Sequence, residues 1–308
     1  MTLPGAGTIE RVGFIGLGNM GGPMCRHLVE AGFDVTAFDL NAGALARVLD
    51  AGARPAASAV DCASGVQALI TMLPAPPHVE SVLLGSEGVI GALDPDAVAI
   101  DMSTSSVAVG SRVVEAARAR GVEVLDAPVA GQSIGANAGT LAIYVGGPED
   151  VFERARPLFD VMGDPARVFY LGPNGSGYTV KLLLNLMWFI EAVAVGEVLT
   201  VGVRAGVSLD RLHGALVGSP ANSVFLERDV RMVLDDGDYD EAFPMRLVTK
   251  DLGLAVELAR ETGVPAELTA LVEQIHRRVR ARYGDEAGEI SAVRLYEDLA
   301  GVRLRLPH

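Results

Sequence analysis

The stretch Arg11-Val-Gly-Phe-Ile-Gly-Leu-Gly-Asn-Met-Gly21 decides the fold, because in it an apolar run leads directly into three closely spaced glycines. Gly16, Gly18 and Gly21 have the spacing GxGxxG, and a helix-like pattern over residues 20–31 follows them. In this setting the first glycine permits a tight turn, the second lets a pyrophosphate approach the backbone, and the third lets the helix pack on the strand. The stretch therefore predicts the phosphate-binding turn of a dinucleotide-binding fold.

An acidic residue follows the turn at the distance where a ribose-binding carboxylate belongs. The apolar run over residues 35–39 ends in Asp39, and the next arginine along the chain is Arg47. In such folds an acid about 20 residues beyond the glycines accepts hydrogen bonds from the ribose hydroxyls, and its charge repels a 2′-phosphate. The sequence therefore favours NAD over NADP. In the alternative interpretation, the glycines only end a strand and Asp39 only caps a helix.

The first half of the chain alternates short apolar runs with helical patterns. We expect strands at residues 12–16, 35–39, 68–73, 97–102, 122–126, 141–145 and 168–171. We expect helices at residues 20–31, 42–51, 107–120 and 148–162. Strand and helix in alternation predict an α/β protein with a doubly wound, Rossmann-type, mostly parallel sheet.

Beyond residue 172 the strand patterns stop, and helical patterns continue to the end of the chain. We therefore predict a dinucleotide-binding domain at residues 1–173 and an all-α C-terminal domain for substrate binding and oligomerisation at residues 174–308. The expected helices lie at residues 178–203, 208–217, 243–262 and 266–283.

The apolar segment at residues 178–203 is long enough to cross a membrane. Lys181, Asn185, Glu191 and Glu197 interrupt it, so it holds no uninterrupted apolar run of the roughly 18 residues typical of a span. A helix that is apolar on most sides is otherwise a buried one. We predict a buried helix here.

Composition excludes several classes of function. The 308 residues carry 25 Lys and Arg against 39 Asp and Glu, a formal charge of −14, which repels nucleic acid and anionic lipid. Cys25 and Cys62 form no metal-binding or disulfide pattern, and the five histidines have no metal-ligand spacing. We expect a cytoplasmic protein that binds no metal, nucleic acid or membrane, and we recognise no targeting sequence at its N-terminus.

Only two of the 25 basic residues are lysines, Lys181 and Lys250. In a chain that uses arginine almost everywhere, a lysine is expected where lysine chemistry is needed. Burial lowers the pKa of a lysine ammonium from about 10.4 toward neutrality, whereas arginine stays protonated. Lys181 follows a helix-start pattern at residues 175–177, and Asn185 lies four residues on, on the same helix face. Lys181 is thus a candidate proton donor and acceptor; otherwise it is a buried ion-pair partner, and Asn185 a core amide.

The chain resembles the 3-hydroxyisobutyrate dehydrogenase-like β-hydroxyacid dehydrogenases along nearly its whole length. Residues 16–24, Gly-Leu-Gly-Asn-Met-Gly-Gly-Pro-Met, resemble the GLGxMGxxM cofactor turn of that family. Further matching blocks lie at residues 72–74, 101–104, 126–136, 139–141, 175–185 and 243–252.

This resemblance implies an NAD(P)-dependent oxidoreductase that interconverts a small β-hydroxy acid and its semialdehyde by hydride transfer. It assigns Lys181 as the catalytic proton donor and acceptor. It assigns the substrate to Ala130, Gly131, Gln132, Asn185 and Lys250. It assigns the cofactor to Gly16, Leu17, Gly18, Asn19, Met20, Gly21, Asp39, Leu40, Leu73, Pro74, Thr104 and Lys250. It also implies a homodimer or homotetramer built through the helical domain.

Two departures from the family pattern lie in residues 126–136, which together with residues 139–141 resemble the substrate loop of that family. Where the family usually reads Pro-Val-Ser-Gly-Gly, this chain has Ala130 and Gln132, which removes a hydroxyl and adds an amide. A substrate other than a plain small β-hydroxy acid therefore stays open.

Two other functions also stay open. One is an imine-reductase-like NADP enzyme, although those relatives usually have Asp or Tyr in place of Lys181. The other is a non-catalytic dinucleotide-binding module.

Overall fold

The computed structural model describes residues 8–240 and 243–307 and divides into two compact units, Met1–Lys181 and Leu182–His308. The division falls within the helix α8 (Ser176–Arg204), whereas the sequence places the domain boundary ahead of that helix. The boundary between residues 173 and 174 stays a prediction.

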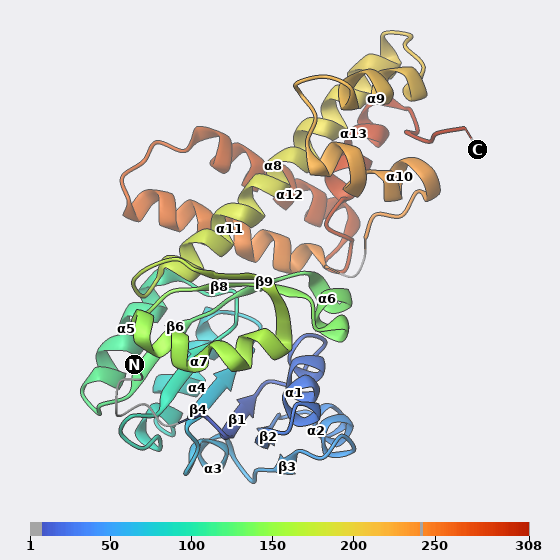
Figure 1. Ribbon diagram of the computed structural model, residues 1–308. Helices are drawn as coiled ribbons and strands as arrows, with labels where there is room; N and C mark the ends of the chain where they lie inside the picture. Colours follow the sequence, from blue (N-terminus) through green and yellow to red (C-terminus); the bar gives the residue numbers. More distant parts are fainter. Residues whose placement is uncertain (1–7, 241–242, 308) are drawn as a thin grey trace. The chain divides into compact units, whose positions relative to one another are not determined.

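The first unit is built on a six-stranded sheet with the order β3-β2-β1-β4-β5-β6, drawn in blue to green in Figure 1. Each neighbouring pair in this sheet is parallel. The strands are β1 (Arg11–Ile15), β2 (Asp34–Phe38), β3 (Arg54–Pro55), β4 (Ala68–Thr71), β5 (Val98–Asp101) and β6 (Glu123–Asp126). The predicted Rossmann-type sheet is confirmed. The two-residue strand β3 was not predicted, because it is too short to form an apolar run.

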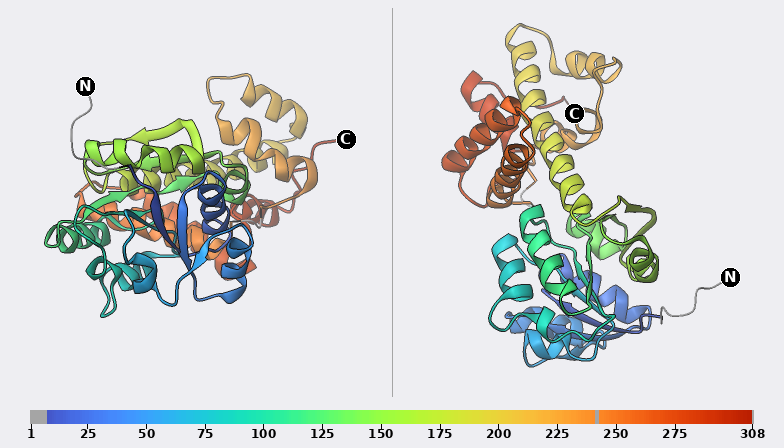
Figure 2. Two further views of the ribbon diagram at one scale, coloured as in Figure 1. Left: turned by 60° about the horizontal axis from the view of Figure 1, so that its bottom comes forward. Right: turned by 90° about the vertical axis from the view of Figure 1, so that its left-hand side faces the viewer.

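Helices cover both faces of this sheet, as Figures 1 and 2 show. Along β4, Ala68 and Ile70 enter one core and Leu69 enters the other, since successive side chains of a strand point to opposite faces. One face is covered by α1 (Gly21–Glu30), α2 (Ala42–Leu49) and α7 (Glu149–Met162). The other is covered by α3 (Ala59–Ala63), α4 (Pro76–Leu84) and α5 (Val107–Arg118). Burial on both faces explains why these strands read as continuous apolar runs.

A second, three-stranded sheet follows β6, with the order β7-β8-β9. Its strands are β7 (Val129–Ala130), β8 (Leu141–Val145) and β9 (Gly163–Tyr170). β7 is antiparallel to β8, and β9 is parallel to it. Two of the predicted strands thus belong to this smaller sheet. Between β7 and β8 lies the short helix α6 (Gln132–Ala138), which contains part of the predicted substrate loop.

The second unit is helical and begins inside α8. Its other helices are α9 (Leu209–Val217), α10 (Arg231–Asp236), α11 (Met245–Glu261), α12 (Glu267–Tyr283) and α13 (Ser291–Ala300), with a π-helical turn at Phe225–Asp229. Trp188 of α8 packs edge-on against Phe225 and donates to Asp229 over 2.9 Å. The predicted all-α domain is confirmed, but α10 and α13 were not predicted.

Helix α8 is less buried than the sequence predicts. By length and composition it could cross a membrane: an 18-residue window has a mean hydropathy of 1.8, and 39% of that window is buried. Core helices of water-soluble proteins also reach such values, so this is weak support for a span. The apolar side chains of Leu183, Met187, Val198 and Val201 are exposed. The prediction of a buried helix was therefore wrong for one side of α8, since an apolar composition does not show which partner covers each face.

Candidate active site

The glycine turn between β1 and α1 is held by contacts that exclude any larger side chain. Gly16 has a φ of +94°, and a Cβ there would overlap the carbonyl oxygen of Met72. A Cβ at Gly21 would overlap the carbonyl oxygen of Gly16. These two glycines are required by the packing of turn, strand and helix, as the GxGxxG pattern predicts.

Gly18 differs, because a Cβ there would meet no atom of the described chain within 4 Å. The protein itself therefore does not explain this glycine, whereas a phosphate group close to the backbone would. Helix α1 also begins without a side-chain cap among the described residues, and its first turn holds no acidic residue. The N–H groups at such a helix start favour an anion. The turn thus fits the pyrophosphate of a dinucleotide.

Asp39 follows β2 and is tied to the glycine turn. Its Oδ2 accepts from the backbone N–H of Leu17 over 2.6 Å, and its Oδ1 accepts from Asn41 over 2.7 Å. Asn41, not Asp39, caps α2 through its side chain. The interpretation of Asp39 as only a helix cap was therefore wrong. A carboxylate has about four acceptor positions, so these two contacts leave room for ribose hydroxyls. Leu40 beside it is 94% exposed.

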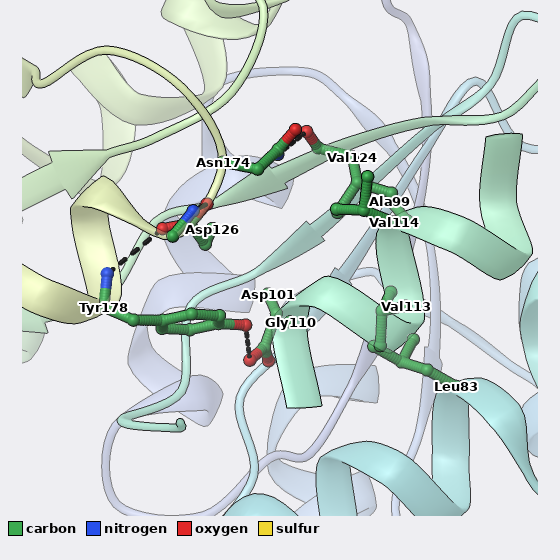
Figure 3. Close-up of a pocket in the computed structure, with 11 residues that line it drawn as sticks. Leu83, Ala99, Asp101, Gly110, Val113, Val114, Val124, Asp126, Asn174 and Tyr178 are labelled. Atoms are coloured by element: carbon green, nitrogen blue, oxygen red, sulfur yellow. Dashed lines mark hydrogen bonds between the residues drawn. The ribbon is translucent and has the colours of Figure 1, made fainter. Parts of the chain in front are cut away.

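A buried carboxylate, Asp101, ends β5 beside the predicted cofactor residues. Its Oδ1 accepts from the hydroxyls of Thr71 and Ser103, both over 2.6 Å. Its Oδ2 accepts from the Tyr178 hydroxyl over 2.6 Å, the bond drawn in Figure 3. Ser103 Oγ also accepts from the backbone N–H of Leu73 over 2.8 Å. Burial raises the pKa of Asp101, although the donated hydrogen bonds oppose this rise.

A second carboxylate, Asp126 at the end of β6, holds the beginning of α8. Its Oδ1 accepts from the N–H of Gly175 over 2.7 Å, and its Oδ2 from the N–H of Tyr178 over 3.1 Å. Burial raises the pKa of Asp126 to about 7, against the lowering effect of these bonds. Both carboxylates line a small cavity of about 10 Å³, shown in Figure 3, which is roughly the room that one water needs.

Lys181 lies one turn after Tyr178 on α8 and is 8% exposed. A lysine ammonium at such a buried position can donate a proton to a substrate oxygen. The two strand-end carboxylates thus reach the turn of α8 that precedes the predicted catalytic residue. In the first unit, the predicted cofactor residues Leu73 and Thr104 follow β4 and β5, and Pro74 follows Leu73.

In the second unit, Asn185 and Lys250 come together on one carboxylate. Asn185 Nδ2 donates to Asp251 Oδ2 over 2.8 Å, and Lys250 Nζ lies 3.0 Å from Asp251 Oδ1. Asp251, on α11, is 2% exposed. The sequence singled out Asn185 and Lys250 but gave Asp251 no role. The sequence offered one signal for it, since Asp251 directly follows Lys250.

In the predicted substrate loop, at residues 126–136 and 139–141, the first predicted substrate residue is Ala130 at the end of β7. Gly131 has a φ of +131°, and Gln132 has a φ of +52°. The left-handed region is uncommon for a residue with a side chain. Gln132 therefore occupies a conformation that glycine would adopt more easily.

Sequence reasoning gave no site role to Asp101, Asp126 or Tyr178. The two acids stand at the ends of apolar runs, where the carboxyl edge of a parallel sheet brings functional groups together. That position was the available signal for both acids. For Tyr178 we find none, because its contact joins residues that are far apart in the chain.

The fold, the glycine turn and Asp39 define a dinucleotide-binding protein. The family model described as the NAD binding domain of 6-phosphogluconate dehydrogenase matches residues 11–172. The model described as NAD-binding of NADP-dependent 3-hydroxyisobutyrate dehydrogenase matches residues 175–296.

Similar proteins cover almost the whole chain. A 3-hydroxyisobutyrate dehydrogenase of Pseudomonas aeruginosa is 37% identical over 86% of this chain and 90% of its own. A 2-(hydroxymethyl)glutarate dehydrogenase of Eubacterium barkeri is 34% identical over 95% and 96%. A solved structure of Mycobacterium tuberculosis 3-hydroxyisobutyrate dehydrogenase with L-serine has a TM-score of 0.87 at 30% identity, covering 94% of this chain and 99% of that one. The chain belongs to the 3-hydroxyisobutyrate dehydrogenase-like family of NAD(P)-binding oxidoreductases, which confirms the resemblance.

The raised pKa of Asp126 predicts a specific dependence of stability on pH. In the folded chain the carboxyl holds its proton up to about pH 7, whereas its ordinary pKa is 3.8. The folded state therefore binds the extra proton between these values, and the free energy of unfolding falls as pH rises, by at most about 1.4 kcal/mol per unit. In Asp126→Asn this contribution is absent.

Urea unfolding of the wild type and of Asp126→Asn between pH 4.5 and 7.5 measures the effect. We expect the wild type to lose stability relative to the variant by about 3 to 4 kcal/mol over this range. Asp50→Asn, at the exposed end of α2, controls for the loss of a surface carboxylate. Parallel pH profiles for the wild type and Asp126→Asn would contradict the assignment.

Proposed function

We propose that this chain is an NAD-dependent dehydrogenase or reductase that interconverts a small β-hydroxy acid and its semialdehyde. One observation carries the proposal: the glycine turn and Asp39 fit a dinucleotide in a chain whose relatives are named hydroxy-acid dehydrogenases. A NAD-dependent L-serine dehydrogenase of Pseudomonas aeruginosa, 34% identical over 87% of this chain, is likewise named as a dehydrogenase of a small hydroxy acid.

Lys181 moves the proton in this proposal. Bound NAD supplies the hydride acceptor in one direction and, when reduced, the hydride donor in the other. During oxidation the hydroxyl oxygen of the substrate gives its proton to the neutral amine of Lys181, while the carbon loses a hydride. During reduction the Lys181 ammonium returns a proton to the carbonyl oxygen. The burial of Lys181 supports this role, because it excludes bulk water as a competing proton donor.

The remaining predicted residues bind and orient the two ligands. We assign the substrate to Ala130, Gly131 and Gln132 and to the Asn185–Asp251–Lys250 group, since an amide and an ammonium held on a buried acid can orient a small anion. We assign the cofactor to the glycine turn, Asp39, Leu40, Leu73, Pro74, Thr104 and Lys250. The exposed Leu40 side chain supports an apolar contact with a nucleotide.

Asp39 should select NAD over NADP. Because its carboxylate repels a 2′-phosphate, we expect NAD to bind at least about tenfold more tightly, a difference of about 1.4 kcal/mol. Asp39→Asn removes the charge but keeps an acceptor for Leu17, and should shrink this preference. Thermal-shift titrations with both nucleotides measure it, because a ligand that binds only the folded state raises the Tm.

Asp34→Asn, at the exposed start of the same strand, is the matched control for the loss of one negative charge. It should keep the preference of the wild type. A wild type that binds both nucleotides equally would contradict the role of Asp39, and a wild type that binds neither would contradict the proposed function.

Lys181→Ala should abolish proton transfer while the cofactor still binds. We expect kcat to fall about 10²–10⁴-fold, the usual contribution of a positioned acid or base. Lys181→Arg should not restore it, because arginine does not give up its proton near neutral pH. Steady-state kinetics on small hydroxy acids and their semialdehydes, with NAD affinity measured in parallel, test this.

Turnover close to the wild type in Lys181→Ala would refute the proton role. If the wild type itself turned over no hydroxy acid or semialdehyde while binding NAD tightly, the non-catalytic dinucleotide-binding module would be the better interpretation.

The chain assembles, in this proposal, as a cytoplasmic homodimer or homotetramer that binds neither nucleic acid nor membrane. The exposed apolar side chains of Leu183, Met187, Val198 and Val201 on α8 support a protein partner, because patches of this kind mark interaction surfaces. The negative charge of −14 supports the absence of nucleic acid and anionic lipid.

Charged substitutions on this side of α8 should dissociate the oligomer. We expect Met187→Glu combined with Val198→Glu to shift the mass measured by light scattering after gel filtration from dimer or tetramer to monomer. Ala119→Glu, an exposed position after α5, is the control and should keep the mass of the wild-type oligomer. A wild type that is monomeric at micromolar concentration would contradict the proposed assembly.

A further inference from the structure

We propose that Tyr178 is a positioning residue: through its hydrogen bond to Asp101 it holds the start of α8, and with it Lys181, in place against the strand ends of the cofactor site. This inference rests on the proposed function, in which Lys181 moves the proton. It gives a task to a buried tyrosine that neither the sequence pattern nor the comparisons single out.

The Tyr178 side chain is fixed by packing as well as by its hydrogen bond. The residue is 3% exposed, and its hydroxyl donates to Asp101 Oδ2 over 2.6 Å. Its ring lies against α5 at Gly110, where a Cβ would come within 2.7 Å of the ring. Figure 3 shows the ring reaching from α8 toward Asp101 and Gly110. The glycine makes the room that the ring occupies.

The backbone of the same residue is held independently. The N–H of Tyr178 donates to Asp126 Oδ2 over 3.1 Å, so the residue is anchored to β6 by its main chain and to β5 by its side chain. Two anchors on one residue of the first helical turns fix both the position of the helix start and its rotation about the axis. Lys181, three residues on, lies on the adjacent turn of the same face.

The other end of the Asp101 carboxylate reaches the cofactor side. Ser103 donates to Asp101 Oδ1 and accepts from the N–H of Leu73, a predicted cofactor residue. One carboxylate therefore connects the loop after β4 with the helix that carries the proton donor. Hydride and proton transfer both depend on placement, and a shift of about 1 Å in a reacting group can lower the rate about 10²-fold.

Protonation supports the direction of this bond. Burial and the neighbouring Asp101 carboxyl raise the pKa of Tyr178 well above its ordinary value of 10, so its hydroxyl keeps the proton that it donates.

Tyr178→Phe tests the proposal, because it removes the hydroxyl and keeps the ring against Gly110. We expect kcat to fall about 10- to 100-fold, while the substrate KM and the Kd for NAD change less than about twofold. A second variant, Gly110→Ala, displaces the ring without removing a polar group and should lower kcat in the same way. Tyr283→Phe is the matched control: its hydroxyl donates to Asp298 over 2.7 Å in the second unit, and kcat should stay within about twofold of the wild type.

Rates are expressed per folded molecule, with the folded fraction measured by near-ultraviolet circular dichroism, so that a loss of stability alone does not count. The inference is overturned if Tyr178→Phe keeps the wild-type kcat, or if Tyr178→Phe and Gly110→Ala raise KM or the Kd for NAD in place of lowering kcat. Lys181→Ala distinguishes a failure of the positioning role from a failure of the proposed function. If Lys181→Ala is inactive and Tyr178→Phe fully active, the proposed function stands and the positioning role fails. An active Lys181→Ala overturns the proposed function itself.

Discussion

The site in the first unit depends on two carboxylates buried at the carboxyl edge of one parallel sheet. Removing a carboxylate from water is costly unless donors surround it. Asp101 meets this cost with three hydroxyl donors, and Asp126 with backbone N–H groups at the start of α8. Because these donors come from β4, the loop after β5 and α8, each carboxylate fixes the distance between elements that are far apart in the sequence. In the proposed mechanism, this arrangement holds the predicted cofactor loop and Lys181 in position.

The second unit uses buried acids in the same way. Asp251 binds the ammonium of its neighbour Lys250 on α11, and it accepts from the amide of Asn185, which joins α8 to α11. Glu297, with no exposed surface, accepts from Tyr239 over 2.6 Å and from Arg305 over 2.7 Å, and so fixes the segment after α13. A buried acid that loses one partner is left with an uncompensated charge, so removing one partner of such a contact destabilises the fold by about 3 to 5 kcal/mol.

The sequence predicts the parts of the fold that local pattern determines. The glycine turn, the long strands and the long amphipathic helices each have a period or a spacing that requires no knowledge of partners, and the structure agrees with them. The two-residue strands β3 and β7 have no such period. Their pairing depends on β2 and β8, which lie elsewhere in the chain.

The candidate site likewise contains residues that local pattern predicts and residues that it does not. Gly16, Gly21 and Asp39 were predictable, because their requirements are local to one strand-turn-helix unit. The bonds of Tyr178 to Asp101 and of Asn185 to Asp251 cross 77 and 66 positions of the chain, and no spacing rule links their partners. Similarly, helix α8 was expected to be buried because its composition is apolar. Composition shows how apolar a side chain is, but not which element covers it.

The substrate loop combines both kinds of information. The family usually reads Pro-Val-Ser-Gly-Gly at these positions. Glycine would adopt without strain the φ of +52° that Gln132 has in this chain. For a residue with a side chain this conformation costs about 1 to 2 kcal/mol. At position 132 this chain has the amide of Gln132 in place of glycine, despite this conformational cost. Two residues earlier, Ala130 replaces the serine of the family pattern and lacks its hydroxyl. Ala130 and Gln132 stand on either side of Gly131, so both departures from the family pattern lie in the loop that the proposed function assigns to the substrate.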